Sequence, residues 1–149
     1  MANQATYDDA NLCLRLYELR REETMRKARN WFATFSANNL EEMQKATPMG
    51  SPENAYLRMV TSYWDMAATF VTSGVLNEEL FMQTNGEALF VWEKVRHLVP
   101  GIREANKMPH YLANLETVAN AAIKRMGPDA YQTFSSRIRG ISAAGSSGR

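Results

Sequence analysis

Residues 51–74, SPENAYLRMVTSYWDMAATFVTSG, contain the local signals for a complete helix. Ser51 suits the N-cap position, because its hydroxyl accepts a hydrogen bond from a free backbone N–H, and Pro52 suits the first turn. Gly74 suits the position just past the helix end, where a positive φ is common. Large and small apolar residues recur between these ends at steps of three and four, as on one face of a helix. They are Tyr56, Val60, Tyr63, Trp64, Ala67, Phe70 and Val71.

Similar helix signals recur along the chain, whereas the alternation typical of strands is nearly absent. Thr6 with Asp9 predicts a capping box that opens a long first helix over residues 7–37. The apolar row predicted for this helix is Leu14, Tyr17, Arg21, Met25, Ala28, Phe32 and Phe35, with Arg21 as its one charged member. A further helix start is predicted at Asn38 or Asn39, and another at Asn77 for a helix that Pro100 and Gly101 end. After a connector over residues 101–108, a helix is predicted from Pro109, followed by a short last helix near Pro128.

These elements predict an all-α fold, a single-domain bundle of five to six helices with a long first helix, over residues 1–140. The tail, residues 141–149, is small and polar, and we predict that it is disordered.

The charge balance of the chain favours no particular class of partner. The 17 basic and 16 acidic residues leave a net charge of +1 over 149 residues, which predicts no general attraction to nucleic acid or membranes. Cys13 is the only cysteine, and no apolar run reaches the roughly 20 residues that span a bilayer. We therefore expect a cytoplasmic protein without a transmembrane segment. Residues 20–29 are basic, although their glutamates cancel much of the charge. The C-terminal segment is the more basic one, with Lys124, Arg125, Arg137, Arg139 and Arg149 against Asp129.

Two stretches together resemble a known protein family. They are YWDMAATFVTSGVLNEELF, residues 63–81, and HLVPGIREANKMPHYLANLETVA, residues 97–119. The family consists of small bacterial all-helical proteins described as a domain of unknown function, and the similarity would extend from Arg29 to Met126. The resemblance implies an all-helical fold and carries no functional residue with it.

Residues that often carry chemistry are few in this chain. Glu93 and His97 fall on the side of their predicted helix that faces away from the core, so we interpret both as solvent-exposed. His110 follows Pro109 in a predicted first turn, and Cys13 has no evident base beside it. We predict no catalytic, cofactor-binding or metal-binding residue and no cofactor, and we expect binding rather than catalysis.

Asp65 stands out because it interrupts an apolar helix. At 100° per residue it points away from the main apolar face, toward a second face of small residues that includes Thr61, Ala68 and Thr72. A weakly charged face of this kind indicates a second packing partner. We predict a structural ion pair between Asp65 and Arg21, with the charged atoms within about 4 Å.

Three hypotheses on function arise from these observations. The leading one is a non-enzymatic protein-interaction or self-associating module, with Phe90, which lies outside the main apolar row, as a candidate interface residue. The second is a small-molecule-binding helical bundle, which could be an enzyme, with an aromatic pocket formed by Trp31, Trp64, Phe70 and Trp92. The third is a contact of the basic C-terminal segment with a membrane or with nucleic acid.

Overall fold

Helices make up the whole regular structure of the described chain. The structure, a computed structural model, describes residues 4–147 and the side chains of residues 4–140. Nine helices and no strand occur in these residues, which confirms the all-α class. The helices are α1 (Tyr7–Arg20), α2 (Glu23–Thr34), α3 (Leu40–Ala46), α4 (Pro52–Thr72), α5 (Glu78–Thr84), α6 (Glu87–Val95), α7 (Val99–Ala105), α8 (Ala113–Met126) and α9 (Pro128–Ser147). The prediction of five to six helices was too low, because two predicted helices are broken and one connector is helical.

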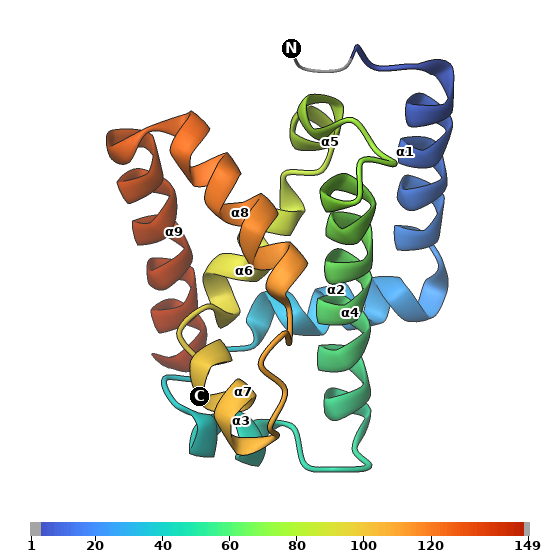
Figure 1. The fold of residues 1–149 in the computed structure, drawn as a ribbon. Helices are drawn as coiled ribbons and strands as arrows, with labels where there is room; N and C mark the ends of the chain where they lie inside the picture. Colours follow the sequence, from blue (N-terminus) through green and yellow to red (C-terminus); the bar gives the residue numbers. More distant parts are fainter. Residues whose placement is uncertain (1–3, 148–149) are drawn as a thin grey trace.

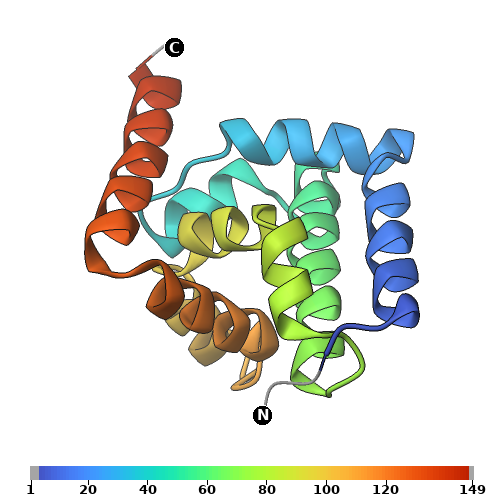
Figure 2. The ribbon, with the colours of Figure 1, turned by 90° about the horizontal axis from the view of Figure 1, so that it is seen from above.

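Helix α4 lies at the centre of the fold. It packs mainly against α2, which crosses it, and against α8 (Figure 1). Helix α6 lies against both α8 and α9. Helices α1 and α9 stand at opposite edges of the molecule in two views at right angles (Figures 1 and 2). The core between α2, α4, α6 and α8 is built around Phe32, Trp64, Val91 and Leu115, each at most 1% exposed.

Several helix ends form as their local sequence predicts. The Asp9 backbone N–H donates to Thr6 Oγ1 at 3.2 Å, and the Thr6 N–H donates to Asp9 Oδ2 at 2.8 Å, which completes the capping box of α1. The Ser51 hydroxyl accepts from the Asn54 N–H at 3.2 Å at the start of α4. Gly74 follows α4 with φ of +82°, a conformation that costs least for glycine. These ends depend only on residues close in sequence.

The long first helix, in contrast, is two helices that meet at Arg21 and Glu22. The Glu22 carboxylate accepts from the N–H groups of Thr24 and Met25 at 3.0 and 2.9 Å, so it caps a new helix instead of continuing the old one. The backbone carbonyl of Arg20 accepts from Arg29 Nη1 at 3.1 Å, which holds the corner. The prediction was wrong here because a capping glutamate is also a good helix former.

The helix predicted from Asn77 to Pro100 is also divided, into α5 and α6. Asn85 leaves the helical conformation between them, with φ of −134° and ψ of 50°. Its side chain donates to the Phe81 carbonyl at 3.3 Å and accepts from Arg20 Nη1 at 3.1 Å. Pro100 lies inside the first turn of α7, where a missing N–H is harmless, so the expected connector begins as a helix.

Helix α9 is longer than the short final helix predicted from the sequence. It runs to Ser147 and so includes most of residues 141–149, for which a disordered tail was predicted; residues 148–149 lie outside the described residues. Ala143 and Ala144 have high helix propensity, and extending a formed helix requires no new nucleus.

Candidate functional site

Phe90, the candidate interface residue, lies half-buried on α6. Its ring meets that of Phe32 edge-on, with 6.3 Å between the ring centroids. Lys94 Nζ lies 5.5 Å from the centroid of the Phe90 ring. Phe90 is therefore packed against the core and is not the exposed residue that its position outside the apolar row suggested.

The four candidate pocket aromatics are packed against other side chains. The ring of Trp64 meets Tyr63 at 4.9 Å between centroids, and Trp31 stacks on Phe35 at 5.0 Å. Trp92 is buried and Phe70 is half-buried at the edge of the core. Three hollows, of about 420, 820 and 650 Å³, are lined by other side chains. The four aromatics line none of these three hollows and pack against neighbouring side chains instead.

Asp65 and Arg21 lie apart, and each has another partner. Asp65 Oδ1 accepts from the backbone N–H of Leu115, in the first turn of α8, at 3.0 Å. The guanidinium of Arg21 lies 5.5 Å from the ring centroid of Tyr17. Among the described residues, none of the six ion pairs joins Asp65 to Arg21.

The Asp65 carboxylate caps the start of α8, where the N-cap residue of the helix provides no side-chain hydrogen bond. Leu112, at the N-cap position, has a left-handed backbone with φ of 54° and offers no side-chain hydrogen bond. Helix α8 therefore begins at Ala113, not at Pro109 as predicted, and His110 lies in the preceding turn. The second packing partner expected for the small-residue face of α4 is α8.

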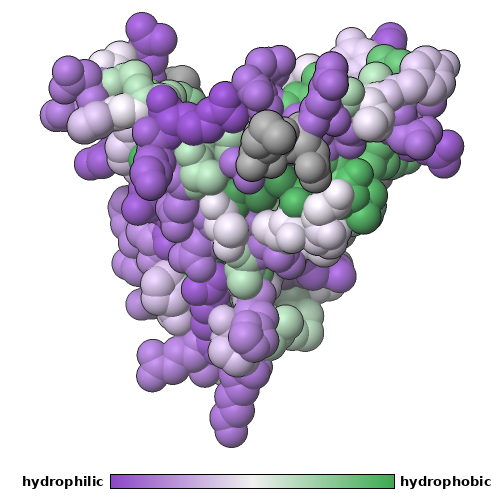
Figure 3. Space-filling view, turned by 45° about the horizontal axis from the view of Figure 1, so that its top comes forward, coloured by the Kyte–Doolittle hydropathy of each residue, from purple (hydrophilic) through white to green (hydrophobic). Residues whose placement is uncertain are grey.

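Helix α1 exposes large apolar side chains outside the side that packs on the molecule. Leu16 is buried, whereas Tyr7, Leu14 and Tyr17 are 80%, 60% and 50% exposed. We call these three residues the α1 outer face. Hydrophobic surface also gathers on the right of the view in Figure 3. In Figure 1 the connection between α4 and α5 runs beside α1 on the same side of the molecule. An apolar surface of this kind is typical of a contact site for another chain.

Glu93, interpreted from the sequence as exposed, is the centre of a buried hydrogen-bond network. Ser135 Oγ donates to Glu93 Oε1 at 2.8 Å, and Tyr131 Oη donates to Oε2 at 2.7 Å. Arg96 Nη1 lies 3.3 Å from Oε2, and Arg139 Nη2 donates to Ser135 Oγ at 2.8 Å. Burial, together with the neighbouring carboxylate of Glu93, raises the pKa of the Tyr131 hydroxyl. Because both carboxylate oxygens have donors, the network fixes α9 on α6.

The sequence did contain a signal for this contact. Tyr131, Phe134 and Ile138 are spaced as one apolar row of α9, and such a row needs a partner helix. Helix periodicity shows that a row must be covered, but it does not identify the helix that covers it.

Lys94, beside Glu93, is buried as well and holds the end of α2. Its Nζ donates to the carbonyl oxygens of Phe32 and Ala33 at 2.8 and 3.1 Å. These carbonyls lie in the last turn of α2, where cations are favoured. Burial lowers the pKa of Lys94 to about 8. The side chain acts as a cap supplied from a distant helix.

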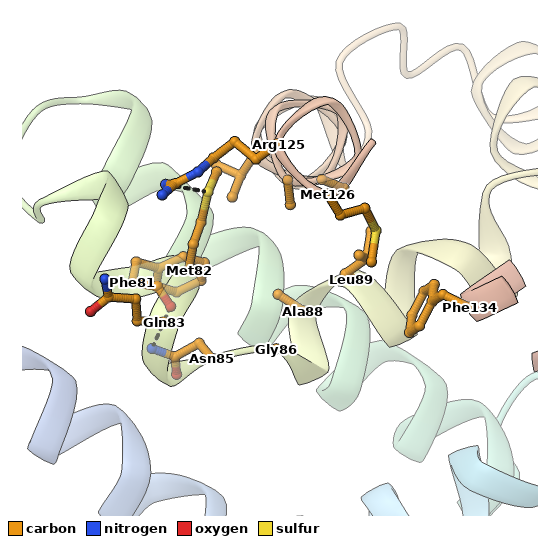
Figure 4. A pocket seen from close by; sticks show the side chains of 13 residues that line it. Phe81, Met82, Gln83, Asn85, Gly86, Ala88, Leu89, Arg125, Met126 and Phe134 are labelled. Carbon is orange, nitrogen blue, oxygen red and sulfur yellow. Dashed lines mark hydrogen bonds between the residues drawn. The ribbon is translucent and has the colours of Figure 1, made fainter. Parts of the chain in front are cut away.

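An apolar hollow of about 420 Å³ lies between α5 and α6 on one side and α8 and α9 on the other (Figure 4). Small residues on facing helices leave this space, since Ala88 comes from α6 and Ala119 and Ala122 come from α8. Phe81, Met82, Leu89, Met126 and Phe134 form larger walls around it. We call this space the apolar hollow. Its volume lies within the range of pockets that hold small molecules.

The polar groups of the apolar hollow lie mainly toward its edge. Arg125 is the one charged residue among the 13 that line it. Arg125 Nη1 lies 3.3 Å from Met82 Sδ, and Nη2 lies 3.6 Å from Glu79 Oε1. The Asn85 side chain is already hydrogen-bonded to Phe81 and Arg20. It therefore forms part of the wall of the apolar hollow.

The remaining candidate residues form no catalytic arrangement within the described part of the chain. His110 and Asp65 both line the hollow of about 650 Å³, but no hydrogen bond joins these two side chains. His97 Nε2 lies 2.6 Å from the Ala37 carbonyl, and Cys13 Sγ accepts from Thr84 Oγ1 at 3.7 Å. No three of the described His, Cys, Asp and Glu side chains gather as a metal site requires. Neither does any described helix combine the length and the hydropathy needed to cross a bilayer.

Comparisons with known proteins identify a family. No curated protein and no solved structure matches the chain. A family model described as a domain of unknown function (DUF4760) matches residues 5–122, which extends further toward the N-terminus than the resemblance seen in the sequence and ends before α9. Because this match covers most of the 149 residues, the chain belongs to the DUF4760 family.

Proposed function

We propose that this protein is a non-enzymatic interaction module that self-associates through the α1 outer face. The observation that supports this function is the exposure of Tyr7, Leu14 and Tyr17 on one side of a helix whose other side already packs on the molecule. Each of these side chains leaves half or more of its surface in water, an arrangement that burial in an interface would relieve.

The charges of α1 favour a second copy of the chain in the opposite direction. Asp8 lies in the first turn, whereas Arg21 lies exposed at the end of the helix. An antiparallel pair of α1 helices places the acidic end of each copy beside the basic end of the other, and it also pairs opposite ends of the two helix dipoles.

The spacing of the α1 outer face is self-complementary. Tyr7, Leu14 and Arg21 recur every seven residues and lie on nearly one line along the helix. A two-fold axis at Leu14 would place Leu14 against its copy and Arg21 against Tyr7 of the other chain. Arg21 already lies over the ring of Tyr17 at 5.5 Å, so its guanidinium is held beside an aromatic surface on this face.

Sedimentation velocity over a wide range of protein concentration tests the proposal. A single helix pair makes a small interface, so we expect a weak, concentration-dependent dimer. Leu14→Glu would place two carboxylates at the axis and should leave a monomer at all concentrations. Met49→Glu is the matched control, because Met49 is 97% exposed in the turn before α4. A wild-type chain that stays monomeric throughout, or a Leu14→Glu variant that still dimerises, would refute the proposal.

The cytoplasm is the compartment that we propose for this module. Cys13, the sole cysteine, is half-buried and forms no disulfide within the chain. A reducing compartment suits such a residue. Localisation of a fluorescently tagged chain would test this, and export from the cytoplasm would contradict it.

A further inference from the structure

We infer that the apolar hollow is a binding site for a small amphipathic carboxylate, with its apolar chain between α6 and α8 and its negative head group at Arg125. This site is separate from the α1 outer face, because none of its lining residues belongs to α1. The inference therefore stands independently of self-association.

The apolar hollow is partly open to solvent, and small buried residues form part of its wall. Unfilled space beside apolar side chains forfeits contacts that a bound apolar ligand can supply. Here Ala88 and Ala119 are at most 4% exposed, and no larger side chain from the facing helix fills the gap between their helices. A space of about 420 Å³ with these walls suits an apolar chain better than water, since its buried part offers few hydrogen-bond partners.

Two methionines allow the walls to adapt to a ligand. Met82 comes from α5 and Met126 from the last turn of α8, and both point toward the space in Figure 4. Methionine is unbranched and flexible, so it fits ligands of varying shape with little strain. Apolar chains of more than one length should therefore be accepted.

Arg125, at the edge of the apolar hollow, favours a ligand with a negative head group. The Arg125 side chain is 49% exposed, and its ion-pair partner Glu79 is 60% exposed at 3.6 Å. A surface pair of this kind contributes little free energy, so a ligand carboxylate can replace Glu79 beside the guanidinium. Arginine presents two parallel N–H donors that match a carboxylate. Glu79 competes with an anionic ligand and would help a cationic one.

Three probes with the same ten-carbon chain separate the contributions of chain and head group. They are decanoate, decanol and decyltrimethylammonium, each titrated into the full chain by calorimetry below its micelle-forming concentration. We expect decanoate to bind most tightly and decyltrimethylammonium most weakly, with a negative heat-capacity change for decanoate from buried apolar surface. Absence of decanoate binding at millimolar concentration, or equal binding of all three probes, would overturn the inference.

Charge variants test the head-group contact without disturbing the packing. Arg125→Gln should weaken decanoate binding by about threefold to tenfold and leave decanol binding unchanged. Glu79→Gln should strengthen decanoate binding, because it removes the competing carboxylate. Lys124→Gln is the matched control, since Lys124 is adjacent in sequence but does not line the apolar hollow. Equal effects of Arg125→Gln and Lys124→Gln would overturn the specific contact with Arg125, because general electrostatic attraction would then explain both.

A variant that fills the apolar hollow tests where the apolar chain of the ligand binds. Ala122→Phe places a ring in the apolar hollow and should reduce the affinity for all three probes by about tenfold or more, whereas Ala121→Phe, beside it on α8 but outside the lining, should not. Circular dichroism confirms that each variant is folded. Binding that survives Ala122→Phe but is lost in Leu14→Glu would place the ligand on α1 and refute the site.

Discussion

Helices α1 and α2 carry one continuous apolar row in the sequence, yet the two halves of this row have opposite environments. Met25, Ala28 and Phe32 of α2 are buried, whereas Leu14 and Tyr17 of α1 lie in solvent. The corner at Arg21 and Glu22 causes the difference, because α1 turns a different side, that of Leu16, toward the molecule. An apolar row therefore identifies a surface that requires a partner, and the partner can be the same chain or another one.

The largest expected difference between the two halves is in stability. Phe32→Ala should lower the free energy of unfolding by about 3–5 kcal/mol, because it leaves a cavity in the core. Leu14→Ala should change it by less than about 0.5 kcal/mol for the monomer, since the side chain is largely exposed. Urea unfolding at low protein concentration measures both. A large loss for Leu14→Ala in the monomer would show that α1 is buried in a way the structure does not describe.

The end of α2 can be weakened without touching its apolar row. Lys94→Met keeps the apolar stem of the side chain but removes the donor to the carbonyls of Phe32 and Ala33. The unsatisfied carbonyls cost about 1–3 kcal/mol, and release of the ammonium from burial offsets part of this. We expect a net loss of roughly 1–2 kcal/mol at pH 7. Chemical denaturation of the two proteins measures this loss.

Lys94→Met should also change how the free energy of unfolding depends on pH. Burial lowers the pKa of folded Lys94 to about 8 from the ordinary 10.5, so the unfolded chain binds more protons between these values. The free energy of unfolding of the wild type should therefore rise relative to that of Lys94→Met from pH 8 to pH 10. Burial raises the pKa of Tyr63 to about 12, and the comparison with the variant cancels its effect. A constant difference across this range would contradict the lowered pKa.

The proposed self-association through α1, the exposed half of the row, can be tested by exchanging charges at the two ends of this helix. Arg21→Glu should weaken dimerisation by about tenfold, roughly 1.4 kcal/mol, because it faces the acidic first turn of the other copy. Adding Asp8→Arg should restore much of the affinity if the two α1 helices are antiparallel. Sedimentation equilibrium measures both constants. Failure of the double variant to recover would exclude the antiparallel pairing.

The smallest expected effect concerns Glu22, at the corner between α1 and α2. The backbone N–H groups of Thr24 and Met25 lower the pKa of the Glu22 carboxyl below its ordinary 4.5. A lowered folded pKa gives stability that is present above pH 4.5 and is lost as the pH falls through the folded pKa. Glu22→Gln should remove this part of the acid sensitivity. Thermal melts of wild type and variant between pH 5 and pH 3 measure it, and parallel curves would argue against the cap.

The sequence predicted features of the fold that depend on neighbouring residues. The all-α class, the capping box of Thr6 and Asp9, and the start of α4 at Ser51 all formed as expected. The candidate sites were predicted less well. Asp65 was correctly interpreted as pointing at a second packing partner, but the atom it binds belongs to Leu115. The apolar hollow was not predicted, because it requires small residues of α6 and α8 to face each other.

The sequence by itself determined that this chain forms amphipathic helices, because helix periodicity and caps act over three or four residues. Only the tertiary structure decided which faces meet. Asp65 caps α8 from α4, and Lys94 caps α2 from α6. Glu93, polar by type, is buried because α9 brings two hydroxyls to it. The physical reason is that a buried charge is stable only where other residues supply its hydrogen bonds. Here those residues are distant in sequence, and local sequence patterns do not predict where they lie.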